Sequence, residues 1–174
     1  RILALGTQSQ MITFTTTAAN ISAGWAGIRY DQTPSTNDTS KFNYCYIQNS
    51  KATGNGNDVN GGGFYFNYYS KCIIDHCTIS NNYAYNGGGA IAAWYSSPKI
   101  LYNTFINNSS DQSGNGINLI YSNSVLDHNT MINSGGIYFF NTPVTITNNY
   151  ISGSTQAAVT CFSANGSLIK GNTF

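Results

Sequence analysis

The chain repeats one short pattern six times, and this repeat restricts its possible folds more than any other feature of the sequence. In each copy an Asn or Cys is followed by Thr or Tyr and then by a large apolar residue. The copies begin at Cys45, Cys77, Asn103, Asn129, Asn149 and Asn172, which gives steps of 32, 26, 26, 20 and 23 residues. Repeats of this length are typical of proteins in which each repeat forms one coil that stacks on the next.

Apolar residues and glycines recur at fixed distances from this pattern. An apolar residue stands three positions before each copy, at Phe42, Ile74, Ile100, Leu126, Ile146 and Ile169. Most copies are preceded by a glycine and a short apolar run, at residues 27–30, 63–66, 116–119 and 136–139. Short alternating segments without a helical period indicate strands, and glycine suits corners where a Cβ would clash or φ must be positive. The absence of Glu also disfavours helices.

These observations predict an all-β solenoid of parallel strands, with residues 1–174 forming one domain of about six to seven coils. Equivalent strands of successive coils would lie about 4.8 Å apart, so that equivalent side chains stack. Inward-pointing Asn103, Asn129, Asn149 and Asn172 would then form a ladder of amide hydrogen bonds that satisfies these polar groups inside the solenoid. In the segment at residues 89–92 either Ala90 or Ile91 could point inward, and the spacing from Ile91 to Ile100 favours Ile91.

The segments ITFTTTAANISAGWAGIRYDQTPSTND and FNYCYIQNS carry a resemblance to a known family. They resemble right-handed parallel β-helix proteins with pectate-lyase-like repeats, and more narrowly the β-helix segments of large secreted or surface-anchored bacterial proteins. The resemblance implies a secreted or cell-surface location. Because neither end shows a capping helix, we expect the chain to be a segment of a longer β-helix, with uncapped ends that pair with neighbouring coils of the same parent chain or with other copies.

Charge and cysteine content limit the possible partners. Charged residues make up only 7% of the chain and the net charge is +1, so the sequence gives no electrostatic reason to expect nucleic acid binding. No apolar run is long enough to span a membrane. Cys45 and Cys77 fall in the same inward column, where a disulfide is possible but free buried thiols are favoured. We expect no metal or cofactor, although oxygen-rich loops at residues 55–58 and 31–38 leave calcium open.

Two Asp-His pairs are the candidates for catalysis. Asp75-His76 and Asp127-His128 occupy equivalent positions two coils apart, so roughly 9 to 10 Å separates them. Such residues can act as general acid and base, and two carboxylates at this spacing are compatible with glycoside hydrolysis. The alternative is that both pairs are exposed corner residues, since Leu101-Tyr102 interrupts the row. The arginine base and acid cluster of pectate-lyase-like enzymes are absent, as are the N-T-D, G-H-G and R-I-K signatures of polygalacturonase-like enzymes.

Aromatic residues form 14% of the chain and supply the candidate ligand-binding surface. Tyr and Trp recur at outward or corner positions of successive coils, and a row of exposed rings beside Asn and Ser could contact sugars. The alternative is an aromatic ladder that only braces the corners. The candidate ligand-binding residues are Tyr65, Tyr68, Trp94, Tyr95, Tyr121 and Tyr138.

The sequence therefore predicts a non-catalytic structural or adhesive β-helix segment of an extracellular protein, with a polysaccharide or cell-surface glycan as its ligand. Two alternatives stay open. The segment could contribute to the groove of a polysaccharide lyase or glycosidase, or it could be the subunit of a self-assembling fibre.

Overall fold

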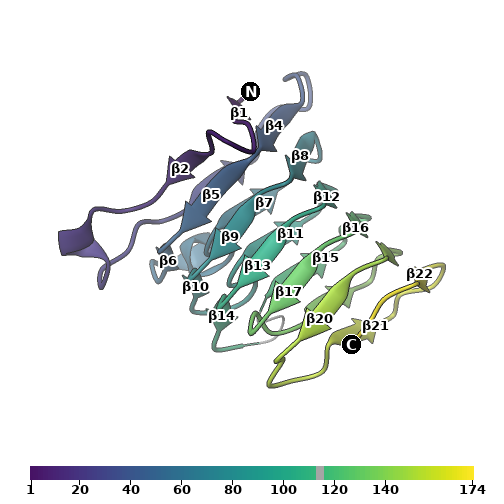
Figure 1. Ribbon diagram of the computed structural model, residues 1–174. Coiled ribbons are helices and arrows are strands. Elements are labelled where there is room, and N and C mark those ends of the chain that lie inside the picture. The colour runs from purple at the N-terminus through teal and green to yellow at the C-terminus, as the bar shows by residue number, and fades with distance from the viewer. Residues whose placement is uncertain (113–115) are drawn as a thin grey trace.

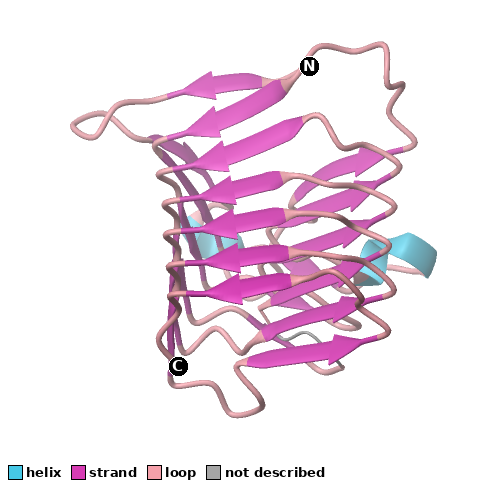
Figure 2. Ribbon diagram, turned by 90° about the vertical axis from the view of Figure 1, so that its right-hand side faces the viewer, coloured by secondary structure: helices cyan, strands magenta, loops and turns pink. Residues whose placement is uncertain are grey.

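The computed structural model describes residues 1–112 and 116–174, which form a solenoid of short parallel strands (Figures 1 and 2). One coil contains β7 (Phe64–Asn67), β8 (Cys72–Asp75), β9 (Thr78–Ser80) and β10 (Tyr83–Ala84). Each of these strands pairs with its equivalents in the coils before and after it. The solenoid therefore has four sheets, which we name the β7, β8, β9 and β10 sheets.

The remaining strands fall into the same four sheets. The β7 sheet also contains β3 (Ile28–Asp31), β11 (Ile91–Trp94), β15 (Ile117–Ile120), β18 (Ile137–Phe140) and β21 (Val159–Phe162). The β8 sheet also contains β1 (Leu3–Leu5), β4 (Ser40–Asn43), β12 (Lys99–Leu101), β16 (Val125–Asp127), β19 (Thr145–Thr147) and β22 (Leu168–Lys170). The β9 sheet also contains β2 (Ile12–Phe14), β5 (Cys45–Gln48), β13 (Thr104–Ile106), β17 (Thr130–Ile132) and β20 (Tyr150–Ser152). The β10 sheet also contains β6 (Lys51–Ala52) and β14 (Ser109–Ser110).

Two short 3₁₀ helices, η1 (Ala18–Asn20) and η2 (Gly56–Val59), lie in longer loops. The η1 loop projects from the side of the solenoid near its N-terminal end (Figure 1). Among the described residues, no helix is long and apolar enough to cross a membrane.

The core consists of columns of apolar side chains that stack in register. The column predicted from the sequence lies in the β8 sheet, where Phe42 pairs with Ile74, Ile74 with Ile100 and Ile100 with Leu126. These four side chains are almost fully buried. In the β7 sheet Ile91 pairs with Phe64 and Ile117 and is completely buried, which confirms the inward direction expected for Ile91.

The predicted asparagine ladder is present. The Nδ2 atom of Asn103 donates to Oδ1 of Asn129 at 3.1 Å, Asn129 donates to Asn149 at 2.9 Å and Asn149 donates to Asn172 at 3.0 Å. The same oxygen of Asn129 also accepts the backbone N–H of Asn103 at 2.9 Å. Each amide therefore satisfies polar groups of its neighbours that would otherwise be buried without partners.

Cysteines occupy the ladder position in the two preceding coils. Cys45 and Cys77 are buried free thiols, as favoured from the sequence. The Sγ atom of Cys77 donates to the carbonyl oxygen of Phe42 at 3.4 Å, and its backbone N–H donates to Oδ1 of Asn103 at 2.9 Å. The asparagine ladder is therefore linked to the earlier coils by the hydrogen bond from the backbone N–H of Cys77 to Asn103.

A second polar ladder follows five residues after the first, and sequence reasoning missed it. The Oδ1 atom of Asn82 accepts the hydroxyl of Ser50 at 2.7 Å, and its Nδ2 atom donates to Asn108 at 3.0 Å. Asn108 in turn donates to the hydroxyl of Ser134 at 3.1 Å. The signal for this ladder was the Asn-Asn and Asn-Ser pairs that close successive repeats, at residues 81–82, 107–108 and 133–134.

At the sharp corners between the sheets, the residues with a left-handed backbone conformation are mostly not glycine. Their φ angles lie between 47° and 60°, a region that residues with a Cβ rarely adopt. Three rows have this geometry: Gln32, Tyr68, Tyr95, Tyr121, Asn141 and Ser163 after the β7 sheet; Tyr44, His76, Tyr102, His128 and Asn148 after the β8 sheet; Asn49, Asn81, Asn107 and Asn133 after the β9 sheet. Glycine is needed instead where the backbones of adjacent coils touch. At Gly136 a Cβ would lie 2.1 Å from the carbonyl oxygen of Ala157.

We predict that Asn129→Ala lowers the free energy of unfolding by about 2–4 kcal/mol. The substitution removes four hydrogen bonds inside the ladder and leaves the buried N–H of Asn103 without an acceptor. Chemical denaturation followed by circular dichroism would measure the loss. Asn123→Ala, at an exposed position that makes no hydrogen bond to other described residues, should stay within about 0.5 kcal/mol of the parent. Equal losses in the two variants would contradict the ladder's structural role.

Candidate functional site

The outer face of the β8 sheet is the candidate site, because exposed aromatic rows border it on both sides. The chain enters each strand of this sheet shortly after the corner row of Tyr68, Tyr95 and Tyr121, and leaves it at the corner row of Tyr44, His76, Tyr102 and His128. The outward positions of the strands between these rows form the floor of the site, and several shallow hollows lie on it.

The tyrosine row at the entry side is both exposed and stacked. The residues of this row, Tyr68, Tyr95 and Tyr121, are 57%, 46% and 43% exposed. Ring centroids of Tyr68 and Tyr95 lie 4.7 Å apart with an interplanar angle of 1°, and those of Tyr95 and Tyr121 lie 4.9 Å apart at 7°. Both faces of Tyr95 are therefore covered by its neighbours. The row offers ring edges and hydroxyl groups to a ligand rather than flat ring faces.

The other three aromatic candidates lie on the β7 sheet and do not join this row. Tyr65 was expected on the surface, and this expectation is wrong because only 1% of the residue is exposed. The Arg29 guanidinium lies 4.6 Å from its ring centroid, and Trp94 packs edge-on at 5.8 Å. Burial raises the pKa of Tyr65 to about 12.

Trp94 and Tyr138 are only partly accessible. The indole N–H of Trp94 is buried and has no hydrogen-bond partner among the described residues. The ring of Tyr138 lies 5.8 Å from that of Phe162, tilted by 46°. Neither residue presents a ring in line with Tyr68, Tyr95 and Tyr121.

At the exit side, the two Asp-His pairs lie on one continuous ring stack. The Nδ1 atom of His76 lies 2.7 Å from Oδ1 of Asp75, and Nδ1 of His128 lies 2.8 Å from Oδ2 of Asp127. Tyr102 was expected to interrupt this row. Instead its ring stacks between the two imidazoles, with centroid distances of 5.1 and 4.8 Å.

This stack separates the two pairs, since Leu101 stands between Asp75 and Asp127 in the register of the β8 sheet. Each carboxylate is bound to its own histidine, so the arrangement does not place an acid and a base around one reacting atom. Partial desolvation raises the pKa of Asp127, but hydrogen bonds from Thr147, His128 and Asn148 outweigh it and lower the pKa overall. A general acid for glycoside cleavage needs a raised pKa.

The floor of the site is rich in lysine. Lys41 and Lys99 stand in one outward column with Ile73 between them. Lys71 precedes β8 and lines a hollow together with Lys99. A neighbouring hollow of about 420 Å³ is bordered by Leu5, Lys41, Phe42, Asn43, Ile73, Asp75 and Leu101. Salt bridges join Arg1 to Asp38 and Arg29 to Asp58, whereas none of the three lysines forms one with a described residue.

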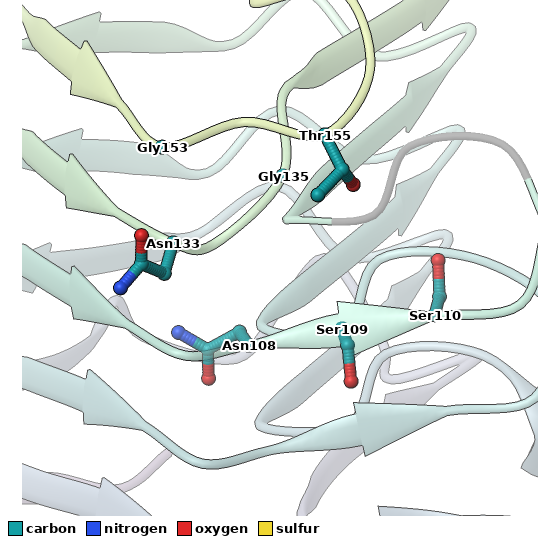
Figure 3. A pocket seen from close by; sticks show the side chains of 7 residues that line it. All are labelled: Asn108, Ser109, Ser110, Asn133, Gly135, Gly153 and Thr155. Atoms are coloured by element: carbon teal, nitrogen blue, oxygen red, sulfur yellow. The ribbon is translucent and has the colours of Figure 1, made fainter.

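A polar pocket lies at a different corner, between the β9 and β10 sheets (Figure 3). It has a volume of about 360 Å³ and is lined by Asn108, Ser109, Ser110, Asn133, Gly135, Gly153 and Thr155. Asn108 belongs to the second ladder and is buried. Gly153 keeps the pocket's edge open to Asn133, because a Cβ there would lie 2.1 Å from the Asn133 Oδ1 atom. The pocket has neither an aromatic ring nor a charged group.

The loops considered for calcium use their acids in other contacts. Asp58 accepts from Nε of Arg29 at 3.1 Å, Asp31 accepts from Nδ2 of Asn67 at 2.7 Å and Asp38 pairs with Arg1 at 3.0 Å. Within residues 1–112 and 116–174, no three His, Cys, Asp or Glu side chains form a group that could hold a metal ion.

Comparison with known proteins agrees with this architecture. A family model described as "Right handed beta helix region" matches residues 2–174. Searches of curated proteins and of solved structures found no match to the chain.

We predict that Asp127→Asn destabilises the protein at neutral pH by less than about 1 kcal/mol, because the pair with His128 is near the surface. A carboxyl whose folded-state pKa is lowered stabilises the fold above its unfolded pKa and loses this contribution as the pH falls through the folded pKa. The difference from the parent should therefore begin to shrink below about pH 4, the ordinary pKa of the carboxyl, and disappear only below its lowered folded-state pKa. Thermal unfolding across this range measures it, and a difference that stays constant with pH would contradict the assignment.

Proposed function

Because the chain belongs to the right-handed β-helix family, we propose that it is a non-catalytic structural and adhesive segment that binds carbohydrate on the outer face of the β8 sheet. The observation that carries this proposal is the row of exposed, stacked Tyr68, Tyr95 and Tyr121 at the border of that face. We further propose an extracellular or cell-surface location, which is supported by the resemblance to segments of large secreted and surface-anchored bacterial proteins.

The row suits a sugar polymer because its hydroxyl groups repeat along the solenoid axis at the spacing of the rungs. The Tyr121 hydroxyl accepts a hydrogen bond from Nδ2 of Asn141 at 3.1 Å. The hydroxyls of Tyr68 and Tyr95 have no hydrogen bond to another described residue, so both are available to a ligand. Phenol groups of this kind donate to and accept from sugar hydroxyls, while ring edges contact the apolar C–H groups of the sugar.

Rigidity of the face is a second reason to expect binding. The tyrosines stand at corners whose backbone is fixed by strand pairing on both sides, and their rings brace one another. A surface that is already ordered loses little conformational entropy when a ligand binds. This arrangement favours recognition over catalysis, which needs an acid and a base around the same bond.

We predict that the triple variant Tyr68→Phe, Tyr95→Phe, Tyr121→Phe binds glycans at least about tenfold more weakly than the parent, while its thermal stability changes little. Phenylalanine keeps the stack and removes only the hydroxyls, and each lost hydrogen bond costs about 0.5–1.5 kcal/mol. A glycan array followed by calorimetry with the best ligand measures the change. Tyr85→Phe removes a hydroxyl from an exposed ring outside the face and is the matched control.

Undiminished glycan binding by the triple variant would show that the row is only a structural brace. The enzymatic alternative is tested on the same samples. We expect no new reducing ends and no unsaturated products when the protein is incubated with pectin, alginate or glycosaminoglycans. Product formation that is lost in an Asp75→Asn, Asp127→Asn double variant would replace the adhesive proposal with a catalytic one.

A further inference from the structure

We infer that the carbohydrate bound on the β8 sheet is a polyanion, an acidic glycan whose carboxylate or sulfate groups pair with Lys41, Lys71 and Lys99. This inference rests on the proposed glycan-binding function and names the ligand class of the same face. It starts from the distribution of the few charges in this chain.

Basic residues are concentrated on this one sheet. The chain has seven Lys and Arg residues. Five of them lie in the β8 sheet or directly beside it, namely Arg1, Lys41, Lys71, Lys99 and Lys170. Arg1 is neutralised by Asp38. The positive charge that remains near the N-terminal half of the face belongs to the three exposed lysines, none of which forms a salt bridge within the described residues.

The register of the sheet sets the spacing of these charges. Lys41 and Lys99 are separated by one intervening strand, so their Cα atoms lie about 10 Å apart. Lys71 directly precedes the middle strand, β8, at a tight turn in which the backbone N–H of Cys72 donates to the carbonyl oxygen of Ser70 at 3.0 Å. Because the three lysines start from separate positions on the sheet, a ligand with several anionic groups in succession can pair with all of them without drawing their side chains together.

The groups around the lysines suit a sugar backbone. Ile73 forms an apolar floor between Lys41 and Lys99, and Thr39, Ser70 and Ser97 line the hollow next to Lys71. This combination of hydroxyls, an apolar surface and cations matches the hydroxyls, C–H faces and acid groups of an acidic polysaccharide. The acids of this face have partners of their own: Asp75 is bound to Nδ1 of His76, Asp127 to Nδ1 of His128, and Asp38 to Arg1.

A nucleic acid is another linear polyanion, and the aromatic geometry disfavours it. Single-stranded nucleic acids gain much of their affinity from bases that stack on aromatic faces. Both faces of Tyr95 are covered by Tyr68 and Tyr121, and Tyr102 is covered by His76 and His128. These two rings therefore lack the free surfaces that bases require.

The test compares the parent with three variants. One is the triple variant Lys41→Gln, Lys71→Gln, Lys99→Gln, and the other two are the single variants Lys99→Gln and Lys170→Gln. Lys170 is an exposed lysine on the last strand of the same sheet, so it is the matched control for Lys99. The probes are polygalacturonate, chondroitin sulfate, neutral galactan and oligothymidylate. Affinities are measured by calorimetry at low and at physiological ionic strength, and circular dichroism checks that each variant is folded.

We expect the parent to bind polygalacturonate, chondroitin sulfate or both more tightly than galactan, with an affinity that falls as salt is added. The triple variant should lose at least about tenfold in affinity, Lys99→Gln should lose part of this, and Lys170→Gln should bind like the parent. The polymer that binds more tightly identifies the anionic group. If the triple variant does not fold, the two single variants test the inference: Lys99→Gln should bind the acidic polymers more weakly than Lys170→Gln does.

Three results would overturn the inference. Equal binding of galactan and the acidic polymers, unaffected by the lysine substitutions, would leave the proposed glycan-binding function intact and remove only the requirement for anionic groups. Tighter binding of oligothymidylate than of either acidic polymer would replace the ligand class. Failure to bind any of the three glycans, with no ligand found on the array, would remove the proposed function together with this inference.

Discussion

The structure depends on amide hydrogen bonds that join each coil to the next at a fixed register. In the first ladder, one oxygen of Asn129 accepts both the backbone N–H and the side-chain amide of Asn103, while its own Nδ2 atom reaches the carbonyl oxygen of Ile100. A shift of one residue between coils would leave these groups buried without partners, at about 1–3 kcal/mol each. It would also turn the apolar column outward. The ladders therefore stabilise one register between successive coils over any shifted one.

Because the register is fixed, residues that recur at the same place in each repeat lie in rows on the surface. The left-handed corner residues after the β8 sheet directly precede the first ladder, so His76, Tyr102 and His128 stack because Cys77, Asn103 and Asn129 do. A left-handed backbone costs about 1–3 kcal/mol at a residue with a Cβ. Contact between aromatic rings contributes roughly 0.5–1.5 kcal/mol per pair and offsets part of this cost. The exposed rings thus support the corners and at the same time form the borders of the candidate site.

The sequence predicted what the repeat itself encodes: the parallel solenoid, the column from Phe42 to Leu126 and the first asparagine ladder. The second ladder is equally periodic, but nothing in the first repeat pattern identifies Asn82 and Asn108 as inward residues. Burial of Tyr65 could not be predicted, because it depends on the side-chain positions of Arg29 and Trp94, which cover its ring. The loss of free ring faces at Tyr95 depends on side-chain angles that residue spacing does not determine.

Inward and outward positions of the β8 sheet carry different information. The inward column from Ala4 to Ile146 contains only apolar residues, because each one packs against the neighbouring coils. The outward column contains Lys41, Ile73, Lys99, Val125 and Thr145, which differ in charge and size without changing the pairing of the strands. Charge placed in this column therefore costs the fold little. In a solenoid, residues that give one coil a different function from the next can therefore lie only at outward and corner positions. On this sheet, Lys41 and Lys99 occupy such outward positions.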